Sequence, residues 1–213
     1  MKDLIEALQA ASRRVGTGTL PGGDAHVVAL SRTYPAPVDD VWDALTDSER
    51  IARWFLPVTG DLRLGGTYQL EGNAGGEIRV CEPPRRLSVT WVFGEPVGPE
   101  DTSLVEVRLE PTGVDATRLD LEHTAVVPPE FWDEFGPGAT GVGWDLGLLG
   151  LLAHLTGVEL GDPATMDADP AMQACMTASS EAWGEALLAS GVGAEETARK
   201  VAATTAFYVP PPG

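Results

Sequence analysis

The chain of 213 residues carries 14 basic and 32 acidic residues, a formal net charge of −18 at pH 7. Hydrophobic residues make up 43% and charged residues 22%, which excludes the disordered, collagen-like and coiled-coil classes and allows one substantial core with an appendage. Such an acidic balance repels phosphate backbones and anionic lipid heads, so we expect no nucleic-acid partner.

The two cysteines, Cys81 and Cys175, have no Cys or His at ligand spacing, which argues against a structural zinc site or a disulfide framework. The N-terminal residues mix charged with apolar side chains and lack the uninterrupted apolar stretch of a secretory signal. The longest apolar segment, from Val142 to Leu155, is interrupted by Asp145 and is too short to cross a bilayer. We therefore expect a cytoplasmic protein without membrane insertion.

The first elements are predicted from apolar spacing and turn residues. Residues 1–24 are predicted to form an N-terminal helix followed by a loop, because apolar residues at helical spacing precede a glycine-rich run. A β-prone segment from Val27 to Tyr34 predicts a strand, and Pro37 fits the first turn of the helix that follows. A second short helix is predicted from Ser48, whose side chain would cap it, to about Phe55.

Residues 60–124 are predicted to form short strands separated by turns, with a hairpin around the glycine-rich turn at 72–76. Apolar and charged residues alternate in the later strands, as Val105 and Val107 alternate with Glu106. Each strand therefore has one dry and one wet face, which is typical of an antiparallel sheet covered on a single side.

A long helix from about Thr140 to Leu155 is predicted to cover the dry face of this sheet. At about 100° per residue, its glycines Gly143, Gly147 and Gly150 fall within one narrow stripe. Glycine inside a helix costs about 1 kcal/mol relative to alanine, so the stripe needs a packing or a functional reason. Two interpretations stay open: close approach of the helix to another element, or a groove held open by the flanking Trp and Leu side chains.

The C-terminal segment, 158–213, is predicted to be a linker followed by two helices. Asp169 followed by Pro170 is typical of a capped helix start, and Gly191 is placed to end that helix. Because short isolated helices are marginal in water, we expect this tail to cover the mouth of the groove or the rim of the sheet, or to build a homodimer. The side chains expected at its buried contacts are Met172, Met176, Trp183 and Leu187.

The order of one strand, two short helices, a run of antiparallel strands and one long helix is the helix-grip arrangement. It is an α+β fold in which an antiparallel sheet wraps around a long C-terminal helix. The sequence segments that match it are Arg32-Thr-Tyr-Pro-Ala-Pro37, Val41-Trp42-x-Ala44-Leu45-Thr46-Asp47, Arg53-Trp54-Phe55-Leu56-Pro57, Leu64-Gly65-Gly66, Gly76-Glu77-Ile78, Pro83-Pro84-Arg85-Arg86-Leu87, Thr90-Trp91 and Gly143-Trp144.

On these residues the chain resembles the START-like (SRPBCC) superfamily, in the branch related to activators of heat-shock chaperone ATPase. The likeness spans residues 25–156, within a predicted domain over 25–157. The resemblance implies a cavity between helix and sheet, in which members of the superfamily bind lipids, sterols, polyketides or plant hormones. Some members are cyclases or aromatases.

The segment from Gly136 to Gly141 formally matches the dinucleotide-binding glycine pattern. That pattern requires a strand-turn-helix unit of a parallel sheet, whereas an antiparallel strand and a loop around Phe131 and Trp132 are predicted to precede it here. No nucleophile motif and no metal triad occurs in the sequence, so no cofactor and no metal are expected.

The titratable candidates leave alternatives open. His26 is expected to be solvated, whereas His123 and His154 are either satisfied core residues or polar handles of the groove. Glu77 could lie on either face of its strand, because distortion at the turn could rotate it. A carboxylate in apolar surroundings is a useful acid or base, so Glu77 or Asp145 beside His123 is the pair to suspect for catalysis.

The leading hypothesis is a non-enzymatic binder of a small apolar or aromatic molecule, held between the long helix and the concave sheet. The predicted ligand-binding residues are Trp54, Phe55, Tyr68, Glu77, Trp91, His123, Trp132, Trp144, Gly147, Leu148 and Leu151. One alternative is a cyclase, dehydratase or hydrolase that uses the same cavity. Another is a regulator of a chaperone ATPase or of another protein partner, which requires an exposed apolar patch.

Overall fold

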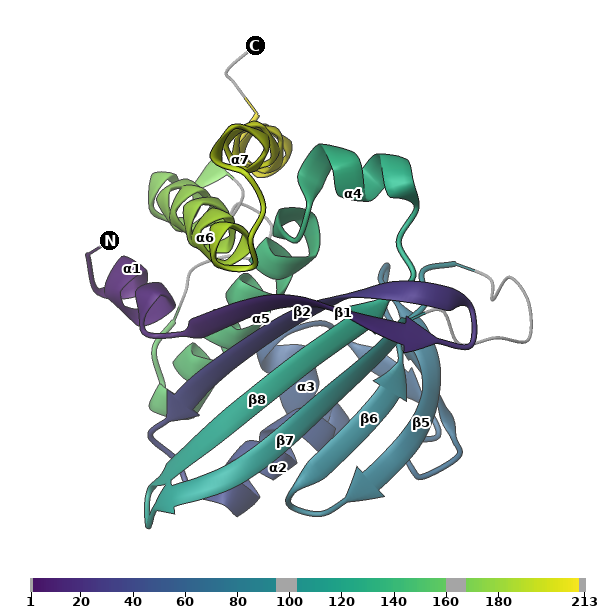
Figure 1. Cartoon of the computed structure of the whole chain (residues 1–213). Coiled ribbons are helices and arrows are strands. Elements are labelled where there is room, and N and C mark those ends of the chain that lie inside the picture. The colour runs from purple at the N-terminus through teal and green to yellow at the C-terminus, as the bar shows by residue number, and fades with distance from the viewer. Residues whose placement is uncertain (1, 95–102, 160–167, 211–213) are drawn as a thin grey trace.

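The computed structural model describes residues 2–94, 103–159 and 168–210, in which an eight-stranded antiparallel sheet curves around a layer of helices (Figure 1). The strands are β1 (Ser12–Leu20), β2 (Gly23–Tyr34), β3 (Val58–Gly60), β4 (Thr67–Leu70), β5 (Gly75–Glu82), β6 (Arg86–Thr90), β7 (Ser103–Gly113) and β8 (Ala116–Ala125), in the spatial order β1-β2-β8-β7-β6-β5-β4-β3. The helices are α1 (Lys2–Gln9), α2 (Val38–Thr46), α3 (Ser48–Trp54), α4 (Pro129–Phe135), α5 (Gly138–Thr156), α6 (Pro170–Ala189) and α7 (Ala194–Tyr208). The predicted α+β helix-grip class is confirmed.

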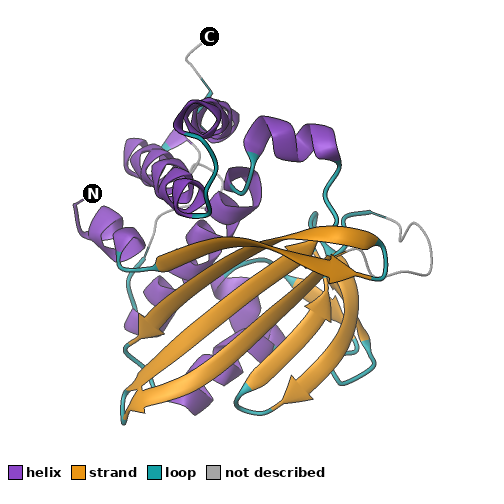
Figure 2. Ribbon diagram, in the orientation of Figure 1, coloured by secondary structure: helices purple, strands orange, loops and turns teal. Residues whose placement is uncertain are grey.

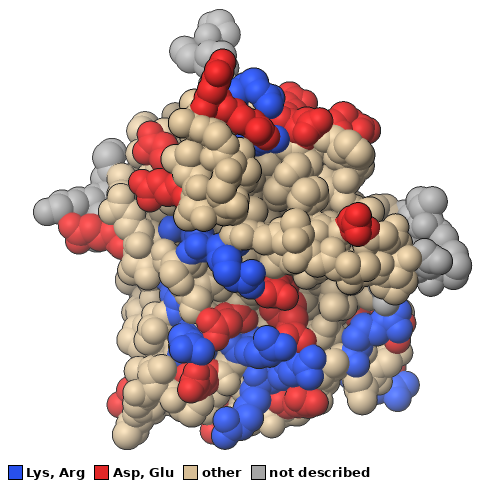
Figure 3. All heavy atoms as spheres, viewed as in Figure 1, with Lys and Arg blue, Asp and Glu red and all other residues tan. Residues whose placement is uncertain are grey.

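The outer face of the sheet carries the charged residues that the alternation predicted. Figure 3 shows basic and acidic side chains interleaved over this face. Arg86 and Arg108 both pair with Glu106, and Arg118 lies 2.9 Å from Glu110. Exposed pairs of this kind each contribute at most about 1 kcal/mol. The outer face is therefore the wet one, and the core lies on the other side.

The inner face of the sheet packs against α2, α3 and α5, which lie behind the sheet in Figure 2. Tyr34 is fully buried on β2, and its hydroxyl donates a hydrogen bond to the carbonyl oxygen of Leu148 on α5, at 3.0 Å. Burial raises the pKa of Tyr34 because the phenolate would lose its hydration. The sheet thus holds α5 through the middle of that helix.

The N-terminal segment differs from its prediction. The helix ends at Gln9, and the segment predicted as a loop contains β1, which pairs with β2 along its whole length. The apolar residues at helical spacing extend into β1, whose own strand signal is the alternation of exposed Thr17 and Thr19 with the less exposed Gly16, Gly18 and Leu20.

Two local predictions also need correction. The segment around Phe131 and Trp132 is not a loop but the short helix α4, with Pro129 in its first turn. The cap of α3 is Asp47 rather than Ser48, since an Asp47 carboxylate oxygen accepts a hydrogen bond from the backbone N–H of Arg50 at 2.9 Å. The second correction concerns a helix start, where the residue one position earlier takes over the role of the cap.

The C-terminal helices form where they were predicted, but α6 covers a different surface. Instead of the mouth of the groove, it packs on α5 and also on α1 and β1 (Figure 1). Gly141 makes this contact feasible, because a Cβ there would lie 2.2 Å from the indole of Trp183. The side chains expected at the buried contacts are indeed buried, within the same chain: Met172, Met176, Trp183 and Leu187.

Helix α7 packs on α6 and on α4. The predicted linker between Gly157 and Asp169 lies for the most part outside the described residues. A homodimer stays a prediction. Within the described ranges, no helix is long and apolar enough to span a membrane.

Candidate ligand-binding cavity

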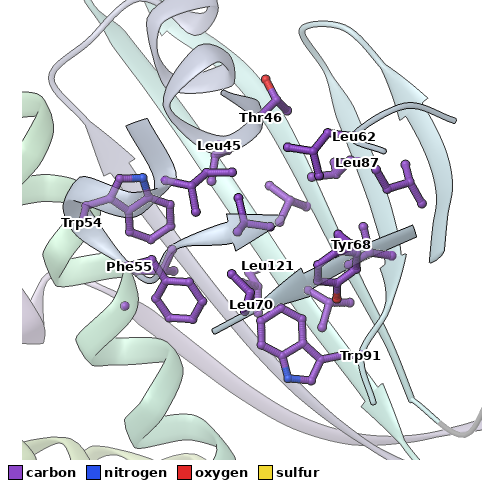
Figure 4. Close-up of a pocket in the computed structure, with 18 of the residues that line it drawn as sticks. Leu45, Thr46, Trp54, Phe55, Leu62, Tyr68, Leu70, Leu87, Trp91 and Leu121 are labelled. Atoms are coloured by element: carbon purple, nitrogen blue, oxygen red, sulfur yellow. The ribbon is translucent and has the colours of Figure 1, made fainter. Parts of the chain in front are cut away.

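An apolar cavity of about 150 Å³ lies between the inner face of the sheet and helices α2, α3 and α5 (Figure 4). The predicted residues found in its walls are Trp54, Phe55, Tyr68, Trp91, Trp144, Gly147 and Leu148. The remaining wall residues are Leu45, Thr46, Ile51, Val58, Leu62, Leu70, Ile78, Cys81, Leu87, Val89, Val105, Val107 and Leu121. The cavity thus occupies the place between helix and sheet that the family resemblance implied.

Aromatic rings form one continuous wall of the cavity. Phe55, directly after α3, has its ring centroid 5.4 Å from that of Trp54 and 6.3 Å from that of Trp91. Trp91, directly after β6, lies 4.9 Å from Trp144 on α5 and 6.3 Å from Tyr68 on β4. Tilted and offset pairs of this kind are the favoured arrangements of aromatic quadrupoles. The wall presents ring faces and edges to an incoming ligand.

The glycine stripe of α5 allows close approach to another element at one turn and borders an open cavity at another. A Cβ on Gly150 would lie 2.6 Å from the backbone oxygen of Trp54, so this glycine allows close approach of α5 to α3. Gly147 instead lines the cavity, where a Cβ would meet the ring of Phe55 at 3.3 Å. Gly143 is exposed and does neither.

A β-bulge in β5 decides which of its side chains enter the cavity. The register shifts between Ile78 and Val80, so strict alternation fails there. Ile78 and Cys81 both face inward and line the cavity. The carboxylate of Glu77 turns away and lies 3.5 Å from the guanidinium of Arg79, with its side chain 39% exposed. The predicted ligand-binding role of Glu77 is therefore not supported by its position.

Most polar groups of the cavity wall are satisfied inside the protein. The indole N–H of Trp54 donates to the carbonyl oxygen of Ala44 at 2.9 Å, and the hydroxyl of Tyr68 donates to the carbonyl oxygen of Thr90 at 2.7 Å. The cavity therefore offers a ligand an almost entirely apolar surface.

His123 lies behind the cavity wall rather than in it. Its Nδ1 accepts a hydrogen bond from the indole N–H of Trp144 at 3.1 Å, and its Nε2 lies 2.7 Å from the hydroxyl oxygen of Ser103. Burial lowers the pKa of His123 to about 4, so the ring is neutral at pH 7. Because an N–H can only donate, Nδ1 is unprotonated and the ring proton is on Nε2, from which it is donated to Ser103.

This tautomer is the wrong one for a serine hydrolase. A general base would have to accept the proton of Ser103 at Nε2, which here carries a proton of its own. Asp145, the other candidate, is buried against α6 and outside the cavity walls. The enzyme hypothesis required Glu77, Asp145 or His123 in the cavity, and the structure places all three elsewhere.

Two further predicted site residues also lie outside the walls. Trp132, on α4, stacks on His26 with ring centroids 3.6 Å apart and planes 8° from parallel. His26 is thus half-buried rather than solvated. Leu151 is fully buried in the main core cluster.

His154, which the sequence left as a core residue or a polar handle of the groove, accepts a hydrogen bond from Arg50 at 3.3 Å and does not line the cavity.

Several wall residues that the site prediction omitted could have been found from strand alternation. Leu87, Val89, Val105, Val107 and Leu121 all belong to the dry phase of their strands. Strand alternation could not identify the wall residues from α2 and from the β3–β4 loop, such as Leu45 and Leu62, because their orientation depends on how these segments pack.

Across the described ranges, no group of three His, Cys, Asp or Glu side chains could hold a metal ion.

One protein-family model matches the sequence of this chain. The sequence model described as "Activator of Hsp90 ATPase homolog 1-like protein" matches residues 35–156, more than half of the chain. No curated protein matches the chain significantly.

Solved structures give a second line of comparison. The crystal structure of CalU16 from Micromonospora echinospora is 38% identical, with a TM-score of 0.67, and the match covers 84% of this chain and 99% of that one. DynU16, a protein of the dynemicin biosynthetic locus, is 29% identical with a TM-score of 0.52, over 61% of this chain and 47% of DynU16. An HSP90 activator from Plasmodium falciparum shares the fold, at 23% identity and a TM-score of 0.53, over 62% of this chain and 97% of that one.

Proposed function

This chain belongs to the family of Activator of Hsp90 ATPase homolog 1-like proteins, within the START-like superfamily, and we propose that it binds a small apolar or aromatic molecule in the cavity between sheet and α5. The observation that carries the proposal is the wall itself: apolar and aromatic side chains surround the space, and its polar groups are almost all satisfied within the protein. Such walls favour ligands that gain little from hydrogen bonding and much from desolvation.

The size of the cavity narrows the class of ligand. An engineered apolar cavity of about 150 Å³ in another protein stays dry and binds benzene. A cavity of about 150 Å³ here accommodates one aromatic ring, and a larger ligand must extend beyond it. The likeness to DynU16, from a biosynthetic locus, favours a biosynthetic product or intermediate as the ligand.

The direct experiment is native mass spectrometry of freshly purified protein, combined with fluorescence titration of the neutral probe N-phenyl-1-naphthylamine. Cys81→Phe places a ring inside the cavity, because Cys81 lines it and is half-buried. We expect this variant to bind the probe at least about tenfold more weakly, since the filled volume is no longer available. Arg79→Phe introduces the same side chain on the outer face of β5 and is expected to bind like the wild type.

A wild type that takes up no probe and carries no co-purified small molecule would overturn the proposal. Equal loss of binding in Cys81→Phe and Arg79→Phe would also contradict it, because the effect would then be independent of the cavity.

A second candidate function, regulation of a chaperone ATPase, is favoured by the family and by an exposed aromatic surface. Phe131 on α4 and Phe207 on α7 are 39% and 59% exposed, and Phe135 lies between them at 5.0 and 5.5 Å. Exposed apolar clusters are typical of protein interaction sites. Stimulation of an Hsp90-type ATPase by the wild type and its loss in Phe207→Ser would support this function, and no stimulation would contradict it.

A further inference from the structure

Trp144 connects the cavity wall to a buried polar pair. Its ring lies 4.9 Å from Trp91 and lines the cavity, whereas its N–H points away from the cavity and donates to Nδ1 of His123 at 3.1 Å. The planes of the indole and the imidazole are nearly perpendicular, at 84°. In this arrangement the imidazole supplies a lone pair at the edge of the indole.

His123 itself is held in one orientation. It is 7% exposed on β8, where its neighbours in the sheet are Val28 on β2 and Val105 on β7. Its second ring nitrogen is engaged by Ser103, 2.7 Å away. Val28, Val105, Ser103 and Trp144 carry no ionisable group, and burial is the cause that lowers the pKa of His123. The acceptor at Nδ1 is therefore present throughout the neutral pH range.

The indole depends on this acceptor more than a surface tryptophan would. A buried N–H without a partner costs about 1–3 kcal/mol, so loss of the acceptor favours rotamers in which the N–H finds another partner or water. Since Trp144 borders the cavity, a change of its rotamer changes the shape of the aromatic wall.

We propose that His123 is a positioning residue of the cavity: by accepting the indole N–H of Trp144, it sets the orientation of the ring wall that a flat apolar ligand contacts. This inference rests on the proposed function, because it concerns binding in the same cavity. It assigns to His123 an indirect role, in which the ring touches Trp144 and not the ligand.

Three substitutions separate the two hydrogen bonds of His123. Asparagine places an amide oxygen near the position of Nδ1 and keeps an acceptor for Trp144, whereas glutamine reaches the position of Nε2 and keeps only the contact with Ser103. Alanine removes both. His26→Ala is the matched control, because His26 also contacts a tryptophan, Trp132, but outside the cavity.

The experiment uses the full chain at pH 7 with two readouts, the indole ¹H–¹⁵N resonance of Trp144 and the affinity for N-phenyl-1-naphthylamine. We expect His123→Asn to keep a hydrogen-bonded indole resonance and an affinity within about threefold of the wild type. His123→Gln and His123→Ala are expected to move the resonance and to weaken binding about tenfold. His26→Ala leaves both unchanged.

Unchanged resonance and affinity in His123→Gln, or equal losses in the asparagine and glutamine variants, would overturn the inference while the proposed function stands. This comparison decides the question even if His123→Ala does not fold. A wild type that binds no probe and carries no co-purified small molecule overturns the proposed function and the inference with it.

Discussion

Arg13 and Asp145 form a bidentate ion pair between residues 132 positions apart in the sequence. Nε and Nη2 of Arg13 donate to the two carboxylate oxygens of Asp145 at 2.9 and 2.8 Å, and the side chains are only 6% and 2% exposed. Ser179 and the indole N–H of Trp183 donate to the same carboxylate. One side chain of α5 thus connects β1 to α6, and the two ends of the chain meet on the domain core.

We expect Asp145→Asn to lower the free energy of unfolding by about 3–5 kcal/mol, because it leaves the buried Arg13 guanidinium without its counter-charge. Urea denaturation measures the loss. Arg14→Ala is the control, since Arg14 pairs with Glu122 while the two side chains are 61% and 44% exposed, and its loss is expected to stay below about 1 kcal/mol. Equal losses in both variants would contradict the prediction.

Gly141→Ala and Gly143→Ala should act in opposite directions. A Cβ on Gly141 would lie 2.2 Å from the indole of Trp183, so we expect overpacking to destabilise the docking of α6 by about 1–3 kcal/mol. The nearest atom to a Cβ on Gly143 is the hydroxyl oxygen of Tyr208, at 3.5 Å, and the higher helix propensity of alanine should stabilise this variant by up to about 1 kcal/mol. Thermal unfolding of the two proteins, side by side, tests the contrast.

The stability of the protein should depend on the protonation of His123. Burial lowers the pKa of His123 to about 4, whereas an unfolded histidine has a pKa of about 6.5. Between these values the unfolded chain binds more protons, so the free energy of unfolding falls as pH falls below about 6.5, by about 2 kcal/mol at pH 5 from this residue. Urea denaturation at pH 7 and pH 5 should show a smaller difference in His123→Asn than in the wild type. An identical difference in the two proteins would be inconsistent with this assignment.

Lys200 should determine the stability of α4. Its side chain is 2% exposed, and its Nζ donates to the carbonyl oxygens of Trp132 and Asp133 at 2.7 and 3.0 Å. We expect Lys200→Met to destabilise the protein by about 1.5–3 kcal/mol and to accelerate amide hydrogen exchange in α4, because these carbonyls lose a charged donor. The neighbouring Arg199→Met removes a donor to Asp133 from an exposed position and should have a much smaller effect.

The sequence alone determined the fold class and the apolar face of the sheet that forms part of the cavity wall. Strand alternation separates a wet from a dry face wherever one face is buried, and it therefore placed Val105, Val107 and Leu121 on the dry face without knowledge of the sheet order, although the site prediction did not include them. The ends of α6 are specified locally. The Asp169 carboxylate caps its first turn, and the helix ends at the turn after Ser190. The aromatic residues followed from the family motif, which contains Trp54, Phe55 and Trp91.

Only the tertiary structure decided where Asp145, Glu77 and His123 point. Asp145 was suspected as a catalytic acid or base, but its partner Arg13 comes from a strand in a segment where the sequence predicted a helix and a loop. Glu77 lies on the opposite face of β5 from Ile78, and the one-residue bulge after Ile78 instead brings Cys81 into the cavity; bulges carry no local signal that periodicity can detect. The role of His123 depends on Trp144 and Ser103, each about twenty residues away, because a histidine tautomer is selected by its hydrogen-bond partners and not by its position in the chain.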